Sequence, residues 1–425
     1  MGERDINSMK TLWIIDHYSS EPKYGGYTRQ YDFAKELSRR GYKVIIVSSS
    51  FSHFNHEYFS NDNILISNFY PNAYYVYLKT ISYHSNSGFG RARSMFSFLF
   101  QVIIHAKKIA HKLGVPDVVN GCSVHPLSWV AAYWISRKYK ARYCIEIRDL
   151  WPYALVSSGD KKKYDPMVIF FAILQKWACS RASKIIYSMS RADEYFRQKL
   201  NISQEKLFYV GQPIDCQRYD KNADNYEALP EEIKEFIDES FLCVFSGYYM
   251  KYEGVYVILQ ACSILVRKNI PIKMVFVGSG EEYEGMFQYV KEYHLEKNVL
   301  IYGRIPKETV PALQRRGDIC IAHLDEPGHP GVFQYGVSKI KVSEYLYSGS
   351  VVLFGFRNAN EPAIKLGGAI QFTPFDADDL ARKIEDVIKM DKSSRTTYGK
   401  HGQEYTRQYH SVEKLTDTLE SVFFK

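Results

Sequence analysis

Short apolar runs alternate with amphipathic stretches along most of the chain. In the first half, the apolar runs predict strands at residues 11–16, 43–48, 117–120, 143–147, 184–188 and 207–210. Stretches of helical length separate them at residues 27–40, 91–113, 126–138, 166–182 and 191–200. Alternating strands and helices are typical of a parallel sheet that is covered on both faces.

The alternation stops at residues 212–240, which are mostly polar and carry Pro213, Asp215 and Pro230. We interpret this stretch as a connection between two domains. The rhythm then resumes, with expected strands at 242–246, 273–277, 299–302, 318–322, 350–353 and 369–372. Expected helices lie at 254–268, 281–293, 308–316, 338–347 and 377–389, with one or two more within 398–424.

This order predicts an α/β protein with two Rossmann-like, doubly wound parallel-sheet domains that face each other across a cleft. We expect an N-terminal domain over residues 1–211 and a C-terminal domain over residues 212–402. A last helix, residues 403–425, is expected to pack back on the N-terminal domain. In such sheets, ligands bind outside the carboxyl ends of the strands.

The 425 residues are 46% hydrophobic and 24% charged, which is the composition of a globular protein. Lys and Arg number 55 against 47 Asp and Glu, a net charge of +8 without a polybasic tail. This disfavours a nucleic-acid partner and suits small anionic ligands or an anionic membrane surface. The seven cysteines include no Cys-x-x-Cys pair, so we expect a reducing compartment and neither a disulfide framework nor a zinc site. Early charges at Glu3, Arg4 and Asp5 argue against a signal peptide.

The loop at residues 16–27 leads from the first expected strand into the first helix. Gly25 and Gly26 allow close backbone approach to a ligand, and the helix start behind them favours an anion. Most strand-to-helix loops have ~2–6 residues, so the greater length here favours ligand binding over a plain turn. The stretch Gly278-Ser279-Gly280 is a weaker signal, because Tyr283 stands where a dinucleotide fingerprint has its third glycine.

The helix expected at residues 338–347 opens with an unfavourable charge pattern. Ser338 is the expected N-cap, but Lys339 and Lys341 follow in the first turn, where the helix dipole favours acidic residues. A bound phosphate would resolve this conflict, and the alternative is a solvated basic turn.

Three further segments could reach a ligand. The loop at residues 323–335 is long and rich in Gly and Pro, as in a lid, and its two histidines lack the spacing of metal ligands. Residues 146–152, EIRDLWP, end a strand with Arg148 beside Asp149, which could contact a ligand or form a structural ion pair. Asp376 and Asp378 lie at a helix start, where capping explains them better than metal binding.

The sequence as a whole resembles a known family. The segments that carry the resemblance are, in order, GGYTRQYDFAKELSRRGYKV, EIRDLWP, VFSG, VFVGSGEE, YGRIPKETVPALQRRGDI and SKIKVSEYLYSGSVVL. They are similar to segments of the retaining glycosyltransferases of family four, which have the GT-B fold. Within that family, the chain is most similar to the bacterial enzymes that build lipopolysaccharide O-antigen, capsule and related surface polysaccharides.

The resemblance implies that the C-terminal domain binds a nucleotide-sugar donor, first of all a UDP-sugar, and that the N-terminal domain binds the acceptor. The family carries two glutamates separated by seven residues. Glu344 matches the second, which would bind the ribose hydroxyls, whereas Gly336 stands at the first. The Arg and Lys that clamp the pyrophosphate in many members are replaced by Tyr248 and Glu253. Lys251 and Lys339 are the candidate replacements.

The resemblance and the loops together define a candidate site. The expected donor-binding residues are Gly25, Gly26, Gly247, Lys251, Gly278, Arg304, Ile305, Ser338, Lys339, Ile340 and Glu344. Tyr27, Arg148 and Asp149 are expected to bind the acceptor. Lys339 would act at the diphosphate, and either Asp149 or His17 would orient the acceptor hydroxyl. We expect no metal and no other cofactor, because helix N-termini and lysines can stabilise the leaving diphosphate.

Residues 94–113 combine an apolar run with lysines at 107, 108 and 112. The apolar positions from Met95 to Leu99, among them Phe96 and Phe98, cannot all lie on one helix face. We therefore expect peripheral attachment to the cytoplasmic face of the membrane. The related transferases often act on lipid-linked acceptors, so the resemblance implies a glycan or undecaprenyl-diphosphate-linked acceptor. The alternative is an ordinary core helix on the sheet.

Two other functions are compatible with the same architecture. One is a nucleotide-sugar 2-epimerase, which would interconvert free donor without an acceptor. The other is a non-catalytic partner protein that binds a nucleotide-sugar and turns nothing over.

Overall fold

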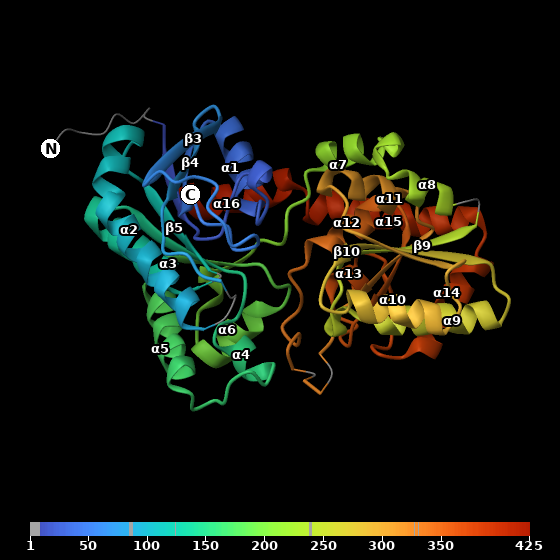
Figure 1. The fold of residues 1–425 in the computed structure, drawn as a ribbon. Helices are drawn as coiled ribbons and strands as arrows, with labels where there is room; N and C mark the ends of the chain where they lie inside the picture. Colours follow the sequence, from blue (N-terminus) through green and yellow to red (C-terminus); the bar gives the residue numbers. More distant parts are fainter. Residues whose placement is uncertain (1–8, 85–87, 124, 238–239, 327, 330) are drawn as a thin grey trace. The chain divides into compact units, whose positions relative to one another are not determined.

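The computed structural model describes residues 9–84, 88–123, 125–237, 240–326, 328–329 and 331–425. The chain divides into two compact units (Figure 1): an N-terminal unit, Met1–Pro213 with Val412–Lys425, and a C-terminal unit, Ile214–Ser411. The residues considered for a signal peptide, and Pro327 and Pro330 of the expected lid, lie outside the described residues.

An eight-stranded sheet forms the middle of the N-terminal unit, in the order β3-β4-β2-β1-β5-β6-β7-β8. Its strands are β1 (Thr11–Ile15), β2 (Lys43–Ser49), β3 (Ile64–Tyr70), β4 (Ala73–Leu78), β5 (Val118–Cys122), β6 (Arg142–Ile147), β7 (Lys184–Tyr187) and β8 (Leu207–Tyr209). All six expected strands are present. The antiparallel hairpin of β3 and β4 was not expected. Strand β3 is a partly exposed edge strand with the polar residues Ser67 and Asn68, whereas β4 is a mostly buried run of aromatic and aliphatic residues whose strand pattern was overlooked.

Helices cover both faces of this sheet. They are α1 (Arg29–Arg39), α2 (Phe89–Leu113), α3 (Leu127–Tyr139), α4 (Tyr153–Ser157), α5 (Pro166–Arg181), α6 (Ala192–Leu200) and α16 (Val412–Phe424). In Figure 1, α1 and α16 lie side by side on one face, and α2 and α3 lie on the other. Among the described residues, no helix combines the length and apolar character needed to cross a membrane.

The chain returns to the N-terminal unit later than expected. The expected returning segment, residues 403–425, falls on two helices. The first, α15 (Lys392–Tyr409), belongs to the C-terminal unit, because Gly399 sits against the backbone of Gly349. Only α16 packs on the N-terminal unit, where Leu415, Leu419 and Phe423 join the core.

A six-stranded parallel sheet forms the middle of the C-terminal unit, in the order β11-β10-β9-β12-β13-β14. Its strands are β9 (Phe241–Tyr248), β10 (Ile272–Ser279), β11 (Val299–Gly303), β12 (Ile319–His323), β13 (Val351–Gly355) and β14 (Ile370–Phe372). The six strands expected in this half are thereby confirmed.

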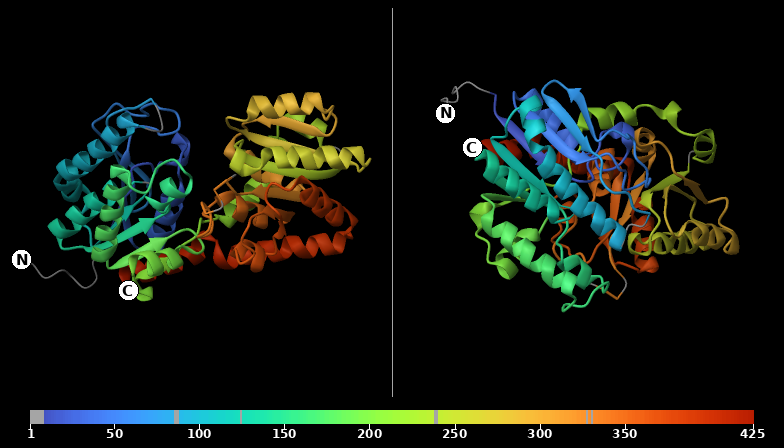
Figure 2. Two further views of the ribbon diagram at one scale, coloured as in Figure 1. Left: turned by 90° about the horizontal axis from the view of Figure 1, so that it is seen from below. Right: turned by 60° about the vertical axis from the view of Figure 1, so that its left-hand side comes forward.

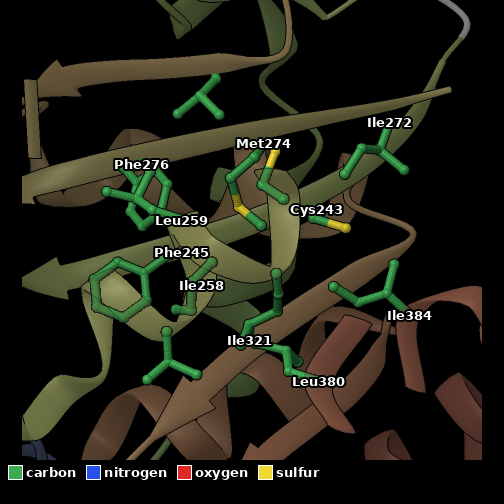
Figure 3. Close-up of a cluster of buried hydrophobic side chains, with 14 of the residues drawn as sticks. Cys243, Phe245, Ile258, Leu259, Ile272, Met274, Phe276, Ile321, Leu380 and Ile384 are labelled. Carbon is green, nitrogen blue, oxygen red and sulfur yellow. The ribbon is translucent and has the colours of Figure 1, made fainter. Parts of the chain in front are cut away.

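The sheet of the C-terminal unit also has helices on both faces (Figures 1 and 2). On one face pack α9 (Val255–Arg267), α10 (Tyr283–Glu292) and α14 (Ala377–Lys389). On the other pack α8 (Glu231–Phe236), α11 (Val310–Arg316), α12 (Ile340–Ser348), α13 (Pro362–Lys365) and α15. Figure 3 shows the core on the α9 side, where Phe245 of β9 and Phe276 of β10 lie among aliphatic side chains.

The polar stretch at residues 212–240 is not simply a connection. From Ile214 onward it belongs to the C-terminal unit and forms α7 (Cys216–Ala223) and α8. Leu229 and Ile233 are buried in the core of that unit. The expectation was wrong because such short helices need few apolar residues, too few to show a period in the sequence.

Candidate functional site

A cavity of about 400 Å³ opens in the C-terminal unit at the carboxyl ends of β9 and β10. Its lining comes from the ends of these strands, the segment after β11, and the first turns of α11 and α12. The lining residues are Ser246, Gly247, Tyr248, Val277, Gly278, Ser279, Arg304, Ile305, Lys307, Val310, Pro311, Ile340, Lys341 and Glu344.

Glycines make the floor of this cavity. Gly247 and Gly278 are neighbours in the parallel pairing of β9 and β10, and their φ values are 147° and 149°. L-residues rarely adopt such a backbone, and a β-carbon on Gly278 would overlap the carbonyl oxygen of Gly247. A β-carbon on Gly280 would likewise overlap the backbone of Tyr249. The strand ends therefore approach each other closely and leave bare backbone facing the cavity.

Lys341 is the buried cation of this cavity. A β-carbon placed on Gly247 would lie 3.4 Å from its Nζ, so the ammonium group sits directly beside the glycine floor. The same Nζ lies 4.3 Å from the centroid of the Phe245 ring and forms an ion pair with Glu253. Burial lowers the pKa of Lys341, and the Glu253 carboxylate opposes that shift.

The other polar groups lie around the rim. The Arg304 side chain donates a hydrogen bond of 2.6 Å to Ser279 Oγ. Glu344 lies one turn after Ile340 on α12 and is partly exposed to the cavity. Apolar contact surface comes from Ile305 and Val310. The cavity thus combines a glycine floor, the buried cation of Lys341, one carboxylate and an apolar wall. This combination suits an anionic ligand with ring systems.

The structure brings six of the expected donor-binding residues together. Gly247, Gly278, Arg304, Ile305, Ile340 and Glu344 all line the cavity. Lys251 does not, since it is an exposed residue of the short 3-10 helix at Lys251–Glu253. Ser338 is not the N-cap either, because α12 begins at Ile340 and its N-cap residue is Lys339.

Lys339 is also outside the lining of this cavity. Its Nζ lies 3.6 Å from Glu253 Oε1 and 5.3 Å from the centroid of the Tyr252 ring. The lysine that faces the cavity is Lys341, two residues further along. Since the N-cap backbone is extended and the helix starts only at Ile340, Lys341 rather than Lys339 turns inward. The sequence could not distinguish the two lysines, because both were expected in the first turn of the helix.

Gly336 stands where the resemblance has its first glutamate. Its φ is 89°, in the left-handed region that favours glycine. A glutamate at this position would strain the backbone conformation found here.

Gly25 and Gly26 belong to the N-terminal unit and do not line the cavity described above. Together with His17 they line a small, nearly filled pocket between the loop at residues 16–27 and residues 49–59. A β-carbon on Gly26, whose φ is 91°, would lie 3.3 Å from the Phe54 ring. Tyr27 packs edge-on against the same ring, with centroids 5.1 Å apart.

His17 is buried in the N-terminal unit. Its Nδ1 lies 2.8 Å from Nε2 of His125, and its ring stacks on Phe98. Burial lowers the pKa of His17, and a neighbouring His125 lowers it further. Burial also lowers the pKa of His125 to about 3. Both imidazoles are therefore neutral at physiological pH.

Arg148 and Asp149 face in different directions. Arg148 is buried and pairs with the buried Asp16 at 3.2 Å, and its Nε donates to the carbonyl oxygen of Ser123 at 2.6 Å. Burial raises the pKa of Asp16, while the Arg148 guanidinium opposes that shift. Asp149, in contrast, is exposed. Arg148 is thus part of a structural ion pair, but with Asp16 and not with the adjacent Asp149 considered in the sequence. Its guanidinium also lies 5.7 Å from the Tyr27 ring centroid.

The remaining candidates have structural roles. His323 is fully buried, with Nδ1 2.9 Å from the Tyr252 carbonyl oxygen and Nε2 accepting from the backbone N–H of Phe375. Asp376 caps α14 by accepting from the backbone N–H of Asp379, as the capping interpretation predicts. Within the described parts of the chain, no group of three or more His, Cys, Asp or Glu side chains is placed to hold a metal ion.

Two family profiles match the chain, one in each unit. Residues 25–218 match "Glycosyltransferase Family 4", and residues 230–405 match "Glycosyl transferases group 1". A search of curated proteins gives no match.

Solved structures match over almost the whole chain. The sucrose-phosphate synthase of Thermosynechococcus elongatus is 14% identical, with a TM-score of 0.68 over 97% of this chain and 98% of its own. Anabaena Alr3699/HepE in complex with UDP and glucose is 13% identical, with a TM-score of 0.66 over 97% and 99%. An E. coli structure described as trehalose-6-phosphate bound with UDP-2-fluoro glucose is 11% identical, with a TM-score of 0.70 over 98% and 99%.

At sequence identities this low, the solved structures show only the fold of the chain, and the two family profiles show its enzyme class. The profiles lie in the same order as the two units, and the cavity falls within the residues matched by the second profile. The chain therefore belongs to the glycosyltransferases of the GT-B fold.

Proposed function

We propose that this protein is a retaining glycosyltransferase that transfers a sugar from a UDP-sugar to a glycan or undecaprenyl-diphosphate-linked acceptor in bacterial surface polysaccharide synthesis. The observation that carries the donor assignment is the cavity of the C-terminal unit, where bare glycine backbone, a buried lysine and a carboxylate converge. Matching structures of Anabaena HepE are complexes with UDP and with UDP-glucose, which supports this class of donor.

The diphosphate and the ribose of a UDP-sugar each have a matching surface in the cavity. The diphosphate would lie against Gly247 and Gly278, where no side chain blocks the backbone and Lys341 supplies a positive charge. It would also face the first turn of α12, whose backbone N–H groups have no side-chain cap. The ribose hydroxyls would donate to the Glu344 carboxylate.

The chemistry that fits this arrangement needs no protein nucleophile. The bond between the anomeric carbon and the diphosphate oxygen breaks, and the acceptor hydroxyl oxygen bonds to the same face of that carbon. The hydroxyl proton passes to the departing phosphate oxygen, whose charge Lys341 and the α12 N-terminus would stabilise. Of the two residues considered for orienting the acceptor, His17 is buried and bonded to His125, whereas Asp149 is exposed. Exposure favours Asp149.

A binding panel and a product analysis test the proposal. A ligand of the folded state stabilises it by about 2.7 kcal/mol at one hundred times its Kd, so UDP-sugars are expected to raise the melting temperature more than GDP-, dTDP- or CMP-sugars. In a transfer reaction followed by NMR, the new linkage should keep the anomeric configuration of the donor. Inversion would contradict the retaining mechanism, and a free epimer formed without acceptor would support the 2-epimerase. No turnover of any bound donor would support a binding protein.

Turnover is expected to proceed without a divalent cation. The positive charge beside the expected diphosphate comes from Lys341, Arg304 and the start of α12. Initial rates should therefore change less than about twofold in excess EDTA, compared with a rate loss of several orders of magnitude where a metal stabilises the leaving group. Activity that EDTA removes and Mg²⁺ or Mn²⁺ restores would contradict this expectation.

Membrane attachment of the N-terminal unit is a further part of the proposal. The exposed large apolar residues of α2 are Phe89, Phe96, Phe100 and Ile104, whereas Phe98 is fully buried. Phe98 is buried because its ring stacks on His17 inside the unit. Lysines 107, 108 and 112 continue the exposed surface of α2.

A second helix presents the same combination. On α5 the exposed apolar residues are Met167, Ile169, Phe170 and Ile173, and three exposed lysines, 161–163, precede the helix. Helices α2, α3 and α5 belong to one helical layer. Helix α2 packs on α3, and Tyr133 of α3 contacts Trp177 of α5. Exposed apolar side chains beside lysines fit an anionic lipid surface.

Vesicle binding tests this surface. The variants Phe100→Ser/Ile104→Ser and Ile169→Ser/Ile173→Ser should each lower co-sedimentation with phosphatidylglycerol vesicles more than about tenfold, because burying one such side chain is worth ~1.5–3 kcal/mol. Phe287→Ser, at an exposed apolar residue of α10, is the matched control and should pellet like the unchanged chain. Unchanged pelleting of both variants would exclude a lipid-binding role, and a shift in oligomeric state instead would assign the surface to a second copy of the chain.

A further inference from the structure

Glu253 is a buried carboxylate held between two lysines at the edge of the cavity. Its Oε2 pairs with Lys341, and its Oε1 lies 3.6 Å from the Nζ of Lys339. The Glu253 side chain is only 4% exposed, and that of Lys341 only 10%. Glu253 does not line the cavity, whereas Lys341 does.

Stability alone does not explain this pair. Replacing a buried ion pair by well-packed apolar residues is often neutral or stabilising, because removing two charges from water costs about as much as their attraction returns. The Nζ of Lys341 lies 4.3 Å from the centroid of the Phe245 ring, next to apolar surface that an apolar side chain could also cover. A charge kept at this position therefore points to a ligand.

The geometry lets Lys341 face two acceptors. Its Nζ pairs with Glu253 and also lies near Gly247, where an added β-carbon would come within 3.4 Å of it. An ammonium group carries three donors, so a second anion that lies on Gly247 can be bound by a small rotation of the same group. The carboxylate and that anion then compete for one positive charge.

We propose that Lys341 binds the diphosphate of the donor, and that Glu253 is its counter-ion in the empty site and limits its affinity for the nucleotide. This inference rests on the proposed UDP-sugar site. Glu253 holds the lysine in place before the donor arrives and gives up part of the interaction when the diphosphate is bound. The two residues of one ion pair therefore have opposite effects on nucleotide binding.

Calorimetric titration with UDP and with uridine tests these opposite effects. Lys341→Met should weaken UDP binding about tenfold or more, because it removes a charge-assisted hydrogen bond. Glu253→Gln should strengthen UDP binding by about two- to tenfold, because the lysine no longer has a competing carboxylate. Neither change should alter uridine binding, since uridine has no phosphate.

Two further variants separate binding from folding. Lys341→Met leaves Glu253 buried without that partner and is expected to lower stability. The double variant Glu253→Gln/Lys341→Met removes both charges, and it should fold normally by circular dichroism yet bind UDP more weakly than Glu253→Gln alone. Lys297→Met, at an exposed lysine of the same unit, is the matched control for loss of one positive charge.

The outcomes are distinct. If the unchanged chain binds UDP but Glu253→Gln weakens that binding, or if uridine and UDP respond alike, the competition between Glu253 and the diphosphate is overturned. If the double variant binds UDP as well as Glu253→Gln does, Lys341 is not the diphosphate ligand. If the unchanged chain binds none of UDP, GDP, CDP and dTDP, the proposed nucleotide-sugar site itself fails.

Discussion

Gly278→Ala is expected to destabilise the C-terminal unit by roughly 2–6 kcal/mol and to remove UDP binding, because backbone strain and overpacking each cost about 1–3 kcal/mol. The strain arises because Gly278 has a φ of 149°, and the overpacking arises because its new β-carbon would overlap the carbonyl oxygen of Gly247. Relief of that overlap would separate β9 from β10 at the cavity floor. Urea unfolding, together with UDP titration of the folded variant, measures both effects.

Gly303→Ala is the matched control for this prediction. Gly303 also has a positive φ, 96°, but a β-carbon there would have no neighbour within 4 Å. It should therefore cost only the conformational part, about 1–2 kcal/mol. Equal losses in the two variants would mean that the close approach of Gly278 to Gly247 has no special cost.

Glu344→Ala is expected to weaken UDP binding about ten- to a hundredfold, since hydrogen bonds to a charged group are worth ~1.5–3 kcal/mol. Its carboxylate is the one acidic group among the described residues that line the cavity. The fold should be unaffected, because the side chain is partly exposed. Isothermal titration with UDP measures the loss.

Two comparisons make this result specific. Glu284→Ala, at an exposed glutamate of α10, should leave UDP affinity unchanged. Titration with inorganic pyrophosphate should separate the ribose from the phosphates, because Glu344→Ala is not expected to weaken a ligand without a ribose. Equal weakening for UDP and pyrophosphate would argue that Glu344 does not contact the ribose.

The strands were predictable because each is a short run of buried β-branched or aromatic residues. Strand β1, for example, is buried at all five positions, and β9 and β10 are each buried at five of eight positions. The elements that the sequence did not predict are stabilised mainly by contacts with neighbouring elements. The edge strand β3 takes its place by pairing with β4, and α8 by burying little more than Ile233. Neither contributes a periodic signal of its own.

The candidate site shows the same limit at the level of single side chains. The glycines, Arg304 and Glu344 could be placed together because they follow strands or begin helices at one edge of a parallel sheet. Which lysine turns into the cavity depends on where α12 begins, and helix boundaries are the least certain part of a sequence-based prediction. Arg148 pairs with Asp16, which is 132 positions away in the chain. No local pattern could have revealed that partner.

Amide hydrogen–deuterium exchange with and without UDP tests most directly whether the cavity of the C-terminal unit is the donor site. Groups that bind a ligand exchange more slowly when it is present, because the ligand stabilises the closed state that it occupies. The account predicts slower exchange at residues 246–249, 277–280 and 339–344 in saturating UDP, and less slowing at 339–344 in Lys341→Met. Slowing confined to the loop at residues 16–27, or none at a concentration that saturates binding, would contradict it.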